Sequence, residues 1–331
     1  MNSSNSSNRN TPLVTVVVPA YNCERYLEDC LQSITNQTYS NLEVLVIDDQ
    51  SSDATAAIAD RHAQSDDRFT VVHKKNAGPG AARNDGLRMA QGRYLQYVDA
   101  DDRLEPNAIE ILVSVAEASL VDVVSFDFDI IKGEETLSRS AAVHAPYPLL
   151  TISDGTKCLQ QIYEGHLGYF SWSFFYRLDS VRLCNMLYPT NIHLLEDMVM
   201  LNHLFRHDIT VAYCNQPLYH YRLVASSLSH SASPKRAQEG FAAVQEVEQL
   251  CSDSERQLFV TSALPTLLYL DSLLPLGDHG HRVIRRKLRD WAPAVDVDTL
   301  DRKTAVKFFL AKMHMLNIIN LGNELKRKGT Q

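Results

Sequence analysis

The chain has 331 residues, of which 45% are hydrophobic and 22% are charged, and its formal net charge at pH 7 is −8. This composition is that of a globular protein with enough apolar residues to build a core without disulfide or metal cross-links. The acidic balance argues against nucleic acid as a partner, because proteins that bind it present a basic face.

The N-terminal segment 1–10 is rich in Ser and Asn and contains no apolar stretch, which predicts a disordered leader rather than a signal peptide. No window of the chain reaches the ~18 uninterrupted apolar residues that a membrane-spanning helix needs. The six cysteines are scattered without a Cys-x-x-Cys pair, so we expect reduced thiols in or near a core. Together these features predict a cytoplasmic protein, which could work at the inner face of the cell membrane.

Strand-like and helix-like segments alternate from the first apolar run onward. Short β-branched or apolar runs predict the strands, and apolar residues at helical spacing predict the helices. The expected strands are 14–18, 42–47, 69–73 and 94–98, and the expected helices are 24–35, one ending near 63 and one ending at 89. Ser52 or Asp53 is the expected N-cap of the second helix. This order predicts an α/β fold with a doubly wound, mostly parallel sheet flanked by helices.

The rest of the chain is less regular. A helix after Pro106 and a strand at 122–128 are expected, followed by an irregular excursion at 132–148. Helical and loop segments are expected from there to about Ser229. From Pro234 onward the pattern is almost wholly helical, which places a boundary near this residue and predicts a C-terminal helical extension.

Polar groups follow three of the first four expected strands. The first is followed by Pro19-Ala20-Tyr21-Asn22, the second by Asp48-Asp49-Gln50-Ser51-Ser52 and the fourth by Asp99-Ala100-Asp101-Asp102. Ligands of open α/β sheets gather at the carboxyl ends of the strands. The coincidence of three such groups predicts a nucleotide site at this edge of the sheet.

Asp99 and Asp101 are the strongest local signal. In an extended segment residues i and i+2 point to the same side, so these two carboxylates can converge on one object. Two close carboxylates repel each other unless a cation lies between them, and Mg²⁺ or Mn²⁺ prefers oxygen ligands. The alternative is a solvated acidic turn after a strand, and the position at a strand end favours the metal.

Asp49 and Arg83 are further candidates at this edge. The Asp49 carboxylate could accept a hydrogen bond from a base or a ribose hydroxyl, or it could serve turn and capping chemistry. Residues 76–84 lack the third glycine of a dinucleotide fingerprint and the Gly-Lys-Ser/Thr of a P-loop. Arg83 would be a suitable fixed cation for the base or the diphosphate, and the alternative is a surface arginine.

Four motifs in this order closely resemble those of the bacterial family 2 glycosyltransferases, over about residues 13–225. They are Val14–Asn22, Ile47–Asp53, Asn76–Gly86 and Asp99–Asp102. The resemblance implies a GT-A fold: one domain over 11–234, with a nucleotide-binding half at about 11–105 and an acceptor half at about 106–234, before the helical region 235–331. It also implies transfer of a sugar from a UDP-sugar in a single inverting displacement.

The resemblance also implies roles for the residues of the donor side. Asp101 would be the main ligand of a Mn²⁺ or Mg²⁺ ion, and Asp99 would orient the donor or share the metal. Pro19, Tyr21 and Asp49 would hold the uracil and the ribose, with Arg83 nearby. His220 or Arg222 would contact the diphosphate; for His220 the alternative is a satisfied core histidine.

On the acceptor side, Glu196-Asp197 matches the acidic pair of the family, and we assign Asp197 as the catalytic base that takes the proton of the acceptor hydroxyl. Without the resemblance the pair would read as the first turn of a helix. Two positions depart from many relatives. Trp172 is followed by Phe174 where they carry Lys, and Leu195 stands before the acidic pair where they carry Gly.

The expected partners are the UDP-sugar and a glycan or lipid-linked acceptor of surface polysaccharide assembly. The basic amphipathic segment 305–325 could lie on an anionic membrane as a peripheral contact, or pack on the catalytic domain or on a second copy of the chain as a homo-oligomer.

Two alternative functions remain. A sugar-phosphate nucleotidylyltransferase would carry a Gly-rich loop with a basic residue after the first strand, where this chain has Pro19-Ala20-Tyr21-Asn22. A non-catalytic nucleotide-sugar-binding module would have no use for Asp99, Asp101 and Asp197 together.

Overall fold

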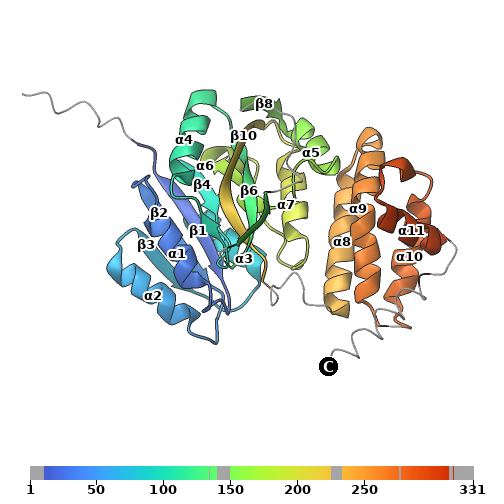
Figure 1. Cartoon of the computed structure of the whole chain (residues 1–331), viewed down its shortest axis with the longest axis horizontal. Helices are drawn as coiled ribbons and strands as arrows, with labels where there is room; N and C mark the ends of the chain where they lie inside the picture. The colour runs from blue at the N-terminus through green and yellow to red at the C-terminus, as the bar shows by residue number, and fades with distance from the viewer. Residues whose placement is uncertain are drawn as a thin grey trace, which may run out of the picture.

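Two structural parts make up the chain, an α/β part and a group of helices at the C-terminal end (Figure 1). The structure is a computed structural model and describes residues 11–133, 135–139, 150–224, 233–275, 277–312 and 316. Within those ranges the α/β part is built on one sheet of ten strands, in which β3-β2-β1-β4-β9-β6-β10-β5 are neighbours. Strand β7 pairs with β6, and β8 pairs with β10.

The first half of the sheet is parallel and confirms the expected doubly wound order. Strand β1 lies between β2 and β4, and β3 lies on the far side of β2. Helices cover these strands, so the strands are continuous apolar runs rather than alternating ones. The elements are β1 (Val14–Ala20), α1 (Leu27–Thr35), β2 (Leu42–Asp48), α2 (Thr55–Ser65), β3 (Phe69–His73), α3 (Pro79–Met89) and β4 (Tyr94–Tyr97).

Beyond β4 the sheet becomes mixed. Strand β9 runs antiparallel to β4 on one side and to β6 on the other, whereas β10 runs parallel to β6. The strands of this half are β5 (Arg103–Leu104), β6 (Val123–Lys132), β7 (Glu135–Arg139), β8 (Leu150–Asp154), β9 (Phe174–Arg177) and β10 (Thr210–Arg222). Its helices are α4 (Ala108–Ser119), α5 (Gly155–Tyr163), α6 (Leu178–Leu183) and α7 (Glu196–Leu204).

Three expectations about local structure were wrong. The irregular excursion expected at 132–148 contains β7, which pairs antiparallel with β6, and residues 140–149 lie outside the described residues. Helix and loop were expected up to about Ser229, but β8, β9 and β10 lie there. Pro217 hides β10 in the sequence, because proline donates no hydrogen bond to a ladder, and the register with β6 shifts on both sides of it. The N-cap of α2 is Ala54 rather than Ser52 or Asp53, and the Asp53 carboxylate instead accepts hydrogen bonds from the amides of Thr55 and Glu24.

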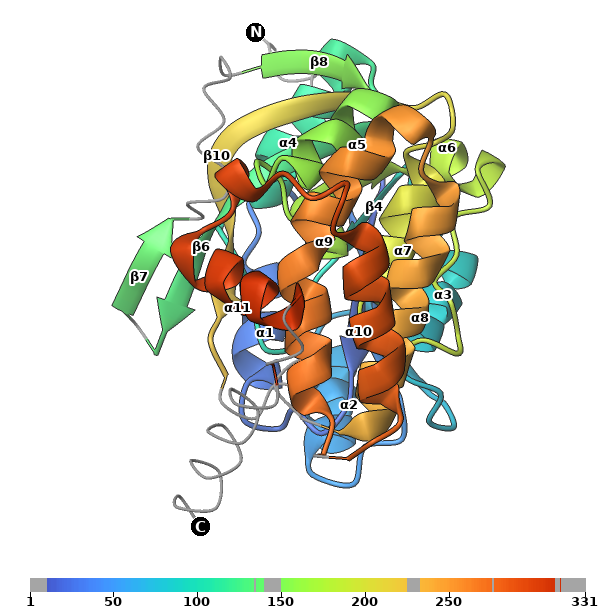
Figure 2. The ribbon, with the colours of Figure 1, turned by 90° about the vertical axis from the view of Figure 1, so that its right-hand side faces the viewer.

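The C-terminal helices begin at Pro234, as the pattern indicated. They are α8 (Pro234–Leu250), α9 (Asp253–Leu273), α10 (Gly280–Trp291) and α11 (Arg302–Lys312). Helix α8 packs against α7 and α9, and Figure 2 shows α9 and α10 side by side, with α11 at an angle on the other side of α9. Helix α11 buries Phe308 in this group and leaves Phe309 exposed. Most of the basic amphipathic segment 305–325 lies outside the described residues.

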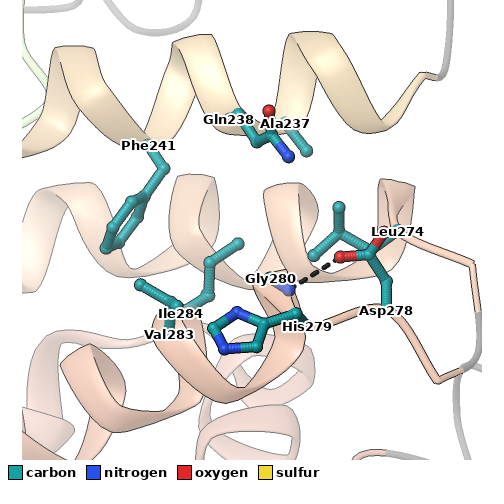
Figure 3. A pocket seen from close by; sticks show the side chains of 9 residues that line it. All are labelled: Ala237, Gln238, Phe241, Leu274, Asp278, His279, Gly280, Val283 and Ile284. Carbon is teal, nitrogen blue, oxygen red and sulfur yellow. Dashed lines mark hydrogen bonds between the residues drawn. The ribbon is translucent and has the colours of Figure 1, made fainter.

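A hollow of about 200 Å³ lies between α8 and the start of α10 (Figure 3). Its lining is mostly apolar, with Gln238, Asp278 and His279 as polar members, and it contains none of the predicted site residues. All six cysteines are free thiols, as expected. Among the described helices, none combines the length and the apolar character needed to cross a membrane.

Candidate active site

The loops that follow β1 and β2 are fastened to each other. The amide of Asn22 donates to Ser51 Oγ at 3.0 Å, and the amide of Ser52 donates to Asn22 Oδ1 at 2.8 Å. Asn22 and Gln50 have positive φ angles of 47° and 65°, which turn the chain sharply at both strand ends. Beside this junction Tyr21 is 43% exposed, so its ring is free to meet a ligand. Pro19 is half-buried at the end of β1.

The Asp49 carboxylate is already occupied by protein groups. It accepts hydrogen bonds from the amides of Ala77 and Gly78, at 2.9 and 2.8 Å, and from Lys74 Nζ at 3.0 Å. These contacts hold the loop between β3 and α3. Gly78 has a φ of 89°, and a Cβ built on it would lie 2.4 Å from His193 Nδ1, so only glycine fits this turn. The nucleotide role of Asp49 stays a prediction, and its loop-anchoring role is an addition to it.

Arg83 lies at the centre of the site and is not a surface arginine, because its side chain is only 6% exposed. One guanidinium nitrogen donates to Asp99 at 2.8 Å. The other donates to Glu196 at 3.1 Å and lies 3.5 Å from Asp197. A single cation therefore joins a carboxylate at the end of β4 to two carboxylates at the start of α7. This connection brings the predicted donor and acceptor residues into one cluster.

Asp197 is held in place by Ser171. The amide and the hydroxyl of Ser171 both donate to its carboxylate at 3.1 Å. Burial raises the pKa of Asp197 to about 7, assisted by the negative charges of Glu196 and Asp99 and opposed by Arg83. Its side chain remains 17% exposed, so a small polar group of a ligand can reach it. A carboxylate with these properties can take up a proton near neutral pH.

The backbone just before Asp197 is unusual. Leu195 caps α7 with φ 68° and ψ 23°, the left-handed conformation that glycine adopts without strain. This is the position at which the family resemblance led us to expect Gly. The Leu195 side chain packs against the core, which compensates for the strained backbone.

The acidic turn after β4 is fixed by a buried network. Asp102 is fully buried and accepts hydrogen bonds from the Tyr219 hydroxyl and the Arg222 amide, both at 2.7 Å. The Tyr219 hydroxyl in turn accepts one from the Asp99 amide at 3.0 Å. Burial and the neighbouring carboxylates raise the pKa of Asp102 well above its usual range. Tyr219 and Asp102 thus hold the backbone of the turn that carries Asp101.

The charge of the Asp101 carboxylate is poorly compensated by its surroundings. Burial raises its pKa to about 6, with the charge of Asp99 as the next cause. No ion-pair partner of Asp101 is present among the residues that the structure describes, although the positive charges of Arg222 and Arg83 lower its pKa somewhat. No cluster of three or more metal-binding side chains occurs in the described part of the chain. Mg²⁺ or Mn²⁺ is commonly held by one or two carboxylates together with phosphate oxygens and water, and the metal role of Asp101 and Asp99 stays a prediction.

His220 and Arg222 lie beside this turn and are engaged by protein groups. His220 Nε2 pairs with Glu105 at 2.8 Å. Arg222 donates from Nε to the Asp101 carbonyl at 2.8 Å and from a terminal nitrogen to Asp29 at 2.5 Å. The predicted phosphate contacts of both residues stay predictions, since each would need its present partner to share it with a ligand.

Three residues of the site were given no role in the sequence analysis: Ser171, Tyr219 and Asp102. Asp102 was visible as the last acid of its motif, whereas Ser171 and Tyr219 come from regions where β9 and β10 were not expected. Phe174, where the family resemblance led us to expect Lys, is fully buried in β9 and packs against Phe205 at a centroid distance of 5.3 Å. It is therefore a core residue.

Metal binding should stabilise the protein more strongly at higher pH. The folded-state pKa of Asp101 is raised from 3.8 to about 6, so the folded chain binds more protons than the unfolded chain between these values. Stability is therefore lost as the pH rises through this range, and a cation restores it. We expect MnCl₂ to raise the melting temperature clearly at about pH 7.5 and little at about pH 5. Differential scanning fluorimetry measures this, and Asp101→Asn should show no such pH dependence; an equal shift in that variant would contradict the assignment.

Comparison with known proteins places this geometry in context. A sequence model described as "Glycosyl transferase family 2" matches residues 15–182. EpsH of Bacillus subtilis (strain 168), which carries a glycosyltransferase name, is 29% identical over 290 residues, covering 85% of this chain and 82% of EpsH. The crystal structure of S. aureus TarS 1-349 in complex with UDP-GlcNAc has a TM-score of 0.69 at 18% identity, covering 96% of this chain and 92% of TarS. The mannosyltransferase PcManGT from Pyrobaculum calidifontis, solved with GDP-Man and Mn²⁺, has a TM-score of 0.54 at 18% identity and covers 92% of this chain and 87% of PcManGT.

Proposed function

The chain belongs to glycosyltransferase family 2 and has the GT-A fold, and from this we propose that it transfers a sugar from a UDP-sugar to an acceptor hydroxyl with inversion at the anomeric carbon. The observation that carries the proposal is the cluster of Asp99, Glu196 and Asp197 around Arg83. It joins the strand ends, where a nucleotide would bind, to a carboxylate that can accept a proton.

The transfer step follows from the position of Asp197. The acceptor hydroxyl gives its proton to this carboxylate, and its oxygen bonds to C1 of the donor sugar. The bond from C1 to the diphosphate breaks at the same time, and UDP leaves with the electron pair. Inversion results because the attack and the departure occur on opposite faces of C1. Ser171 keeps the base oriented, since both of its donors point at the Asp197 carboxylate.

Asp101, assisted by Asp99, would hold a Mn²⁺ or Mg²⁺ ion, which offsets the negative charge that develops on the leaving diphosphate. The protein fold keeps the side chain of Asp99 and the turn of Asp101 in position. Arg83 fixes Asp99, and the network of Asp102 and Tyr219 fixes the turn that carries Asp101. In the proposed setting, the assembly of a surface polysaccharide or lipid-linked glycan, the acceptor would be a glycan hydroxyl.

A panel of nucleotides tests the donor class. With Mn²⁺ present we expect UDP-sugars, of the glucose, galactose or N-acetylglucosamine type, to raise the melting temperature, because Pro19, Tyr21 and Asp49 would hold uracil. The stabilisation should disappear with a chelator. GDP-glucose is the matched control for UDP-glucose, since it carries the same sugar and diphosphate on a different base. A larger shift with GDP-glucose than with every UDP-sugar would contradict the assignment of UDP.

A nucleotidylyltransferase is disfavoured by the loop after β1. Such an enzyme needs a Gly-rich loop with a basic residue there. This chain has Tyr21 and Asn22 instead, and Asn22 is hydrogen-bonded to Ser51 and Ser52.

A further inference from the structure

A stack of parallel aromatic rings runs from the core to the surface next to the predicted base. Tyr219 and Trp172 lie face to face with centroids 4.2 Å apart and planes 9° apart. Phe170 stacks with Trp172 as well, at 4.9 Å and 15°. Tyr219 and Trp172 are at most 2% exposed, whereas Phe170 is 37% exposed. The stack therefore reaches solvent at Phe170.

The ring of Phe170 is held in one orientation by its neighbours. Phe128 meets it edge-on at 5.7 Å, and Tyr221 lies nearly parallel to it at 6.2 Å. A Cβ built on Gly168 would lie 2.4 Å from Cδ2 of this ring, so the absence of a side chain at Gly168 is what leaves room for it. An exposed aromatic ring fixed in this way loses little conformational freedom when a ligand covers it.

The same segment carries the contacts to the base. Phe170 directly precedes Ser171, whose amide and hydroxyl hold Asp197. Tyr221, which stacks with Phe170 and Trp172, belongs to the stretch of β10 whose Tyr219 hydroxyl and Arg222 amide donate to Asp102 of the acidic turn. The exposed ring is thus joined along the chain to the contacts of the base and through Tyr221 to the strand that holds the acidic turn.

We propose that Phe170, flanked by Tyr221, is the acceptor subsite and that the acceptor there is a sugar ring that lies flat on Phe170 and presents one hydroxyl to Asp197. This inference rests on the proposed transferase function. The C–H face of a pyranose is an apolar, nearly planar surface, which an aromatic ring can cover. An acceptor that carries a phosphate at this point would instead need a cation, whereas the contacts around Phe170 are the aromatic rings of Phe128, Trp172 and Tyr221.

Steady-state kinetics with simple acceptors tests the proposal. Methyl glycosides of glucose, galactose and N-acetylglucosamine serve as probes, with ribitol phosphate and glycerol phosphate as non-cyclic alternatives. Phe170→Leu keeps an apolar side chain but removes the flat ring, and we expect it to raise the KM for the accepted glycoside by about ten-fold. Phe170→Tyr keeps the ring and should restore a KM close to that of the natural protein.

The control variant is Phe309→Leu, which makes the same change at an exposed phenylalanine on α11, remote from the site. It should leave the KM unchanged. An unchanged KM in Phe170→Leu, transfer to none of the glycosides, or a preference for either phosphate over every glycoside would overturn the proposal. Calorimetry of UDP binding in the presence of Mn²⁺ distinguishes failure of the sugar subsite from failure of the proposed transferase function. If the natural protein does not bind UDP, the transferase function itself is refuted. If it binds UDP and the KM of Phe170→Leu is unchanged, only the sugar subsite is refuted.

Discussion

Asp197→Asn should lower kcat for sugar transfer by about 10²- to 10⁴-fold, the usual contribution of a general base. Asparagine has the same shape but cannot take up the proton of the acceptor hydroxyl. Its amide oxygen can still accept from the Ser171 amide, and its amide group can donate to the Ser171 hydroxyl, so the local structure should persist. The binding of UDP with Mn²⁺ should therefore be retained, which calorimetry can confirm alongside the kinetics.

The pH profile gives an independent reading of the same residue. Because the pKa of Asp197 is raised to about 7, the natural protein should gain activity as the pH rises through this value and the carboxylate loses its proton. The residual activity of the asparagine variant should lack this rise. Glu196→Gln is the matched control, since it removes the adjacent carboxylate that also pairs with Arg83. Near-normal turnover of Asp197→Asn, or a larger loss in Glu196→Gln, would show that the base is assigned to the wrong residue.

Asp101→Ala should abolish the metal-dependent part of UDP binding. The Asp101 carboxylate has no ion-pair partner in the described part of the chain, and burial, followed by the charge of Asp99, raises its pKa to about 6. In isothermal titration calorimetry, the natural protein should bind UDP with higher affinity when Mn²⁺ is present than when a chelator is present. In the variant, the affinity should be the same with Mn²⁺ and with chelator.

A second variant separates this effect from a general loss of charge. Asp290→Ala removes an exposed carboxylate on α10, far from the strand ends, and should leave UDP binding unchanged. Metal-dependent binding that survives Asp101→Ala would mean that another residue holds the ion.

Local patterns explain why the first half of the fold could be predicted from the sequence. Strands β1 to β4 are short apolar runs with helices on both sides, and each is followed by residues that stop a strand, so their order and their polar ends were visible. The second half was hidden because pairing there depends on distant segments. Strand β10 contains Asn215, Gln216 and Pro217, which interrupt any alternation, and its ladder continues only because β6 accommodates the shifts.

The candidate site shows the same division. The motifs placed acidic and basic residues at the right ends of the right strands, and the resemblance assigned them roles. They did not reveal that Arg83 and Glu196, 113 positions apart, form an ion pair. Nor did they reveal that the carboxylate of Asp49 anchors a loop, because two of its three donors are backbone amides, which any residue type could supply. Such contacts are set by tertiary packing rather than by local propensity.

The left-handed backbone of Leu195 has a consequence for how sequences of this kind should be compared. A non-glycine residue in this conformation costs about 1–2 kcal/mol, yet here it is kept just ahead of the acidic pair. The requirement at this position is therefore a bend in the main chain rather than a particular amino acid. A search that demands glycine would reject a chain whose helix start has the required shape, and backbone torsion angles are the sounder criterion for the position.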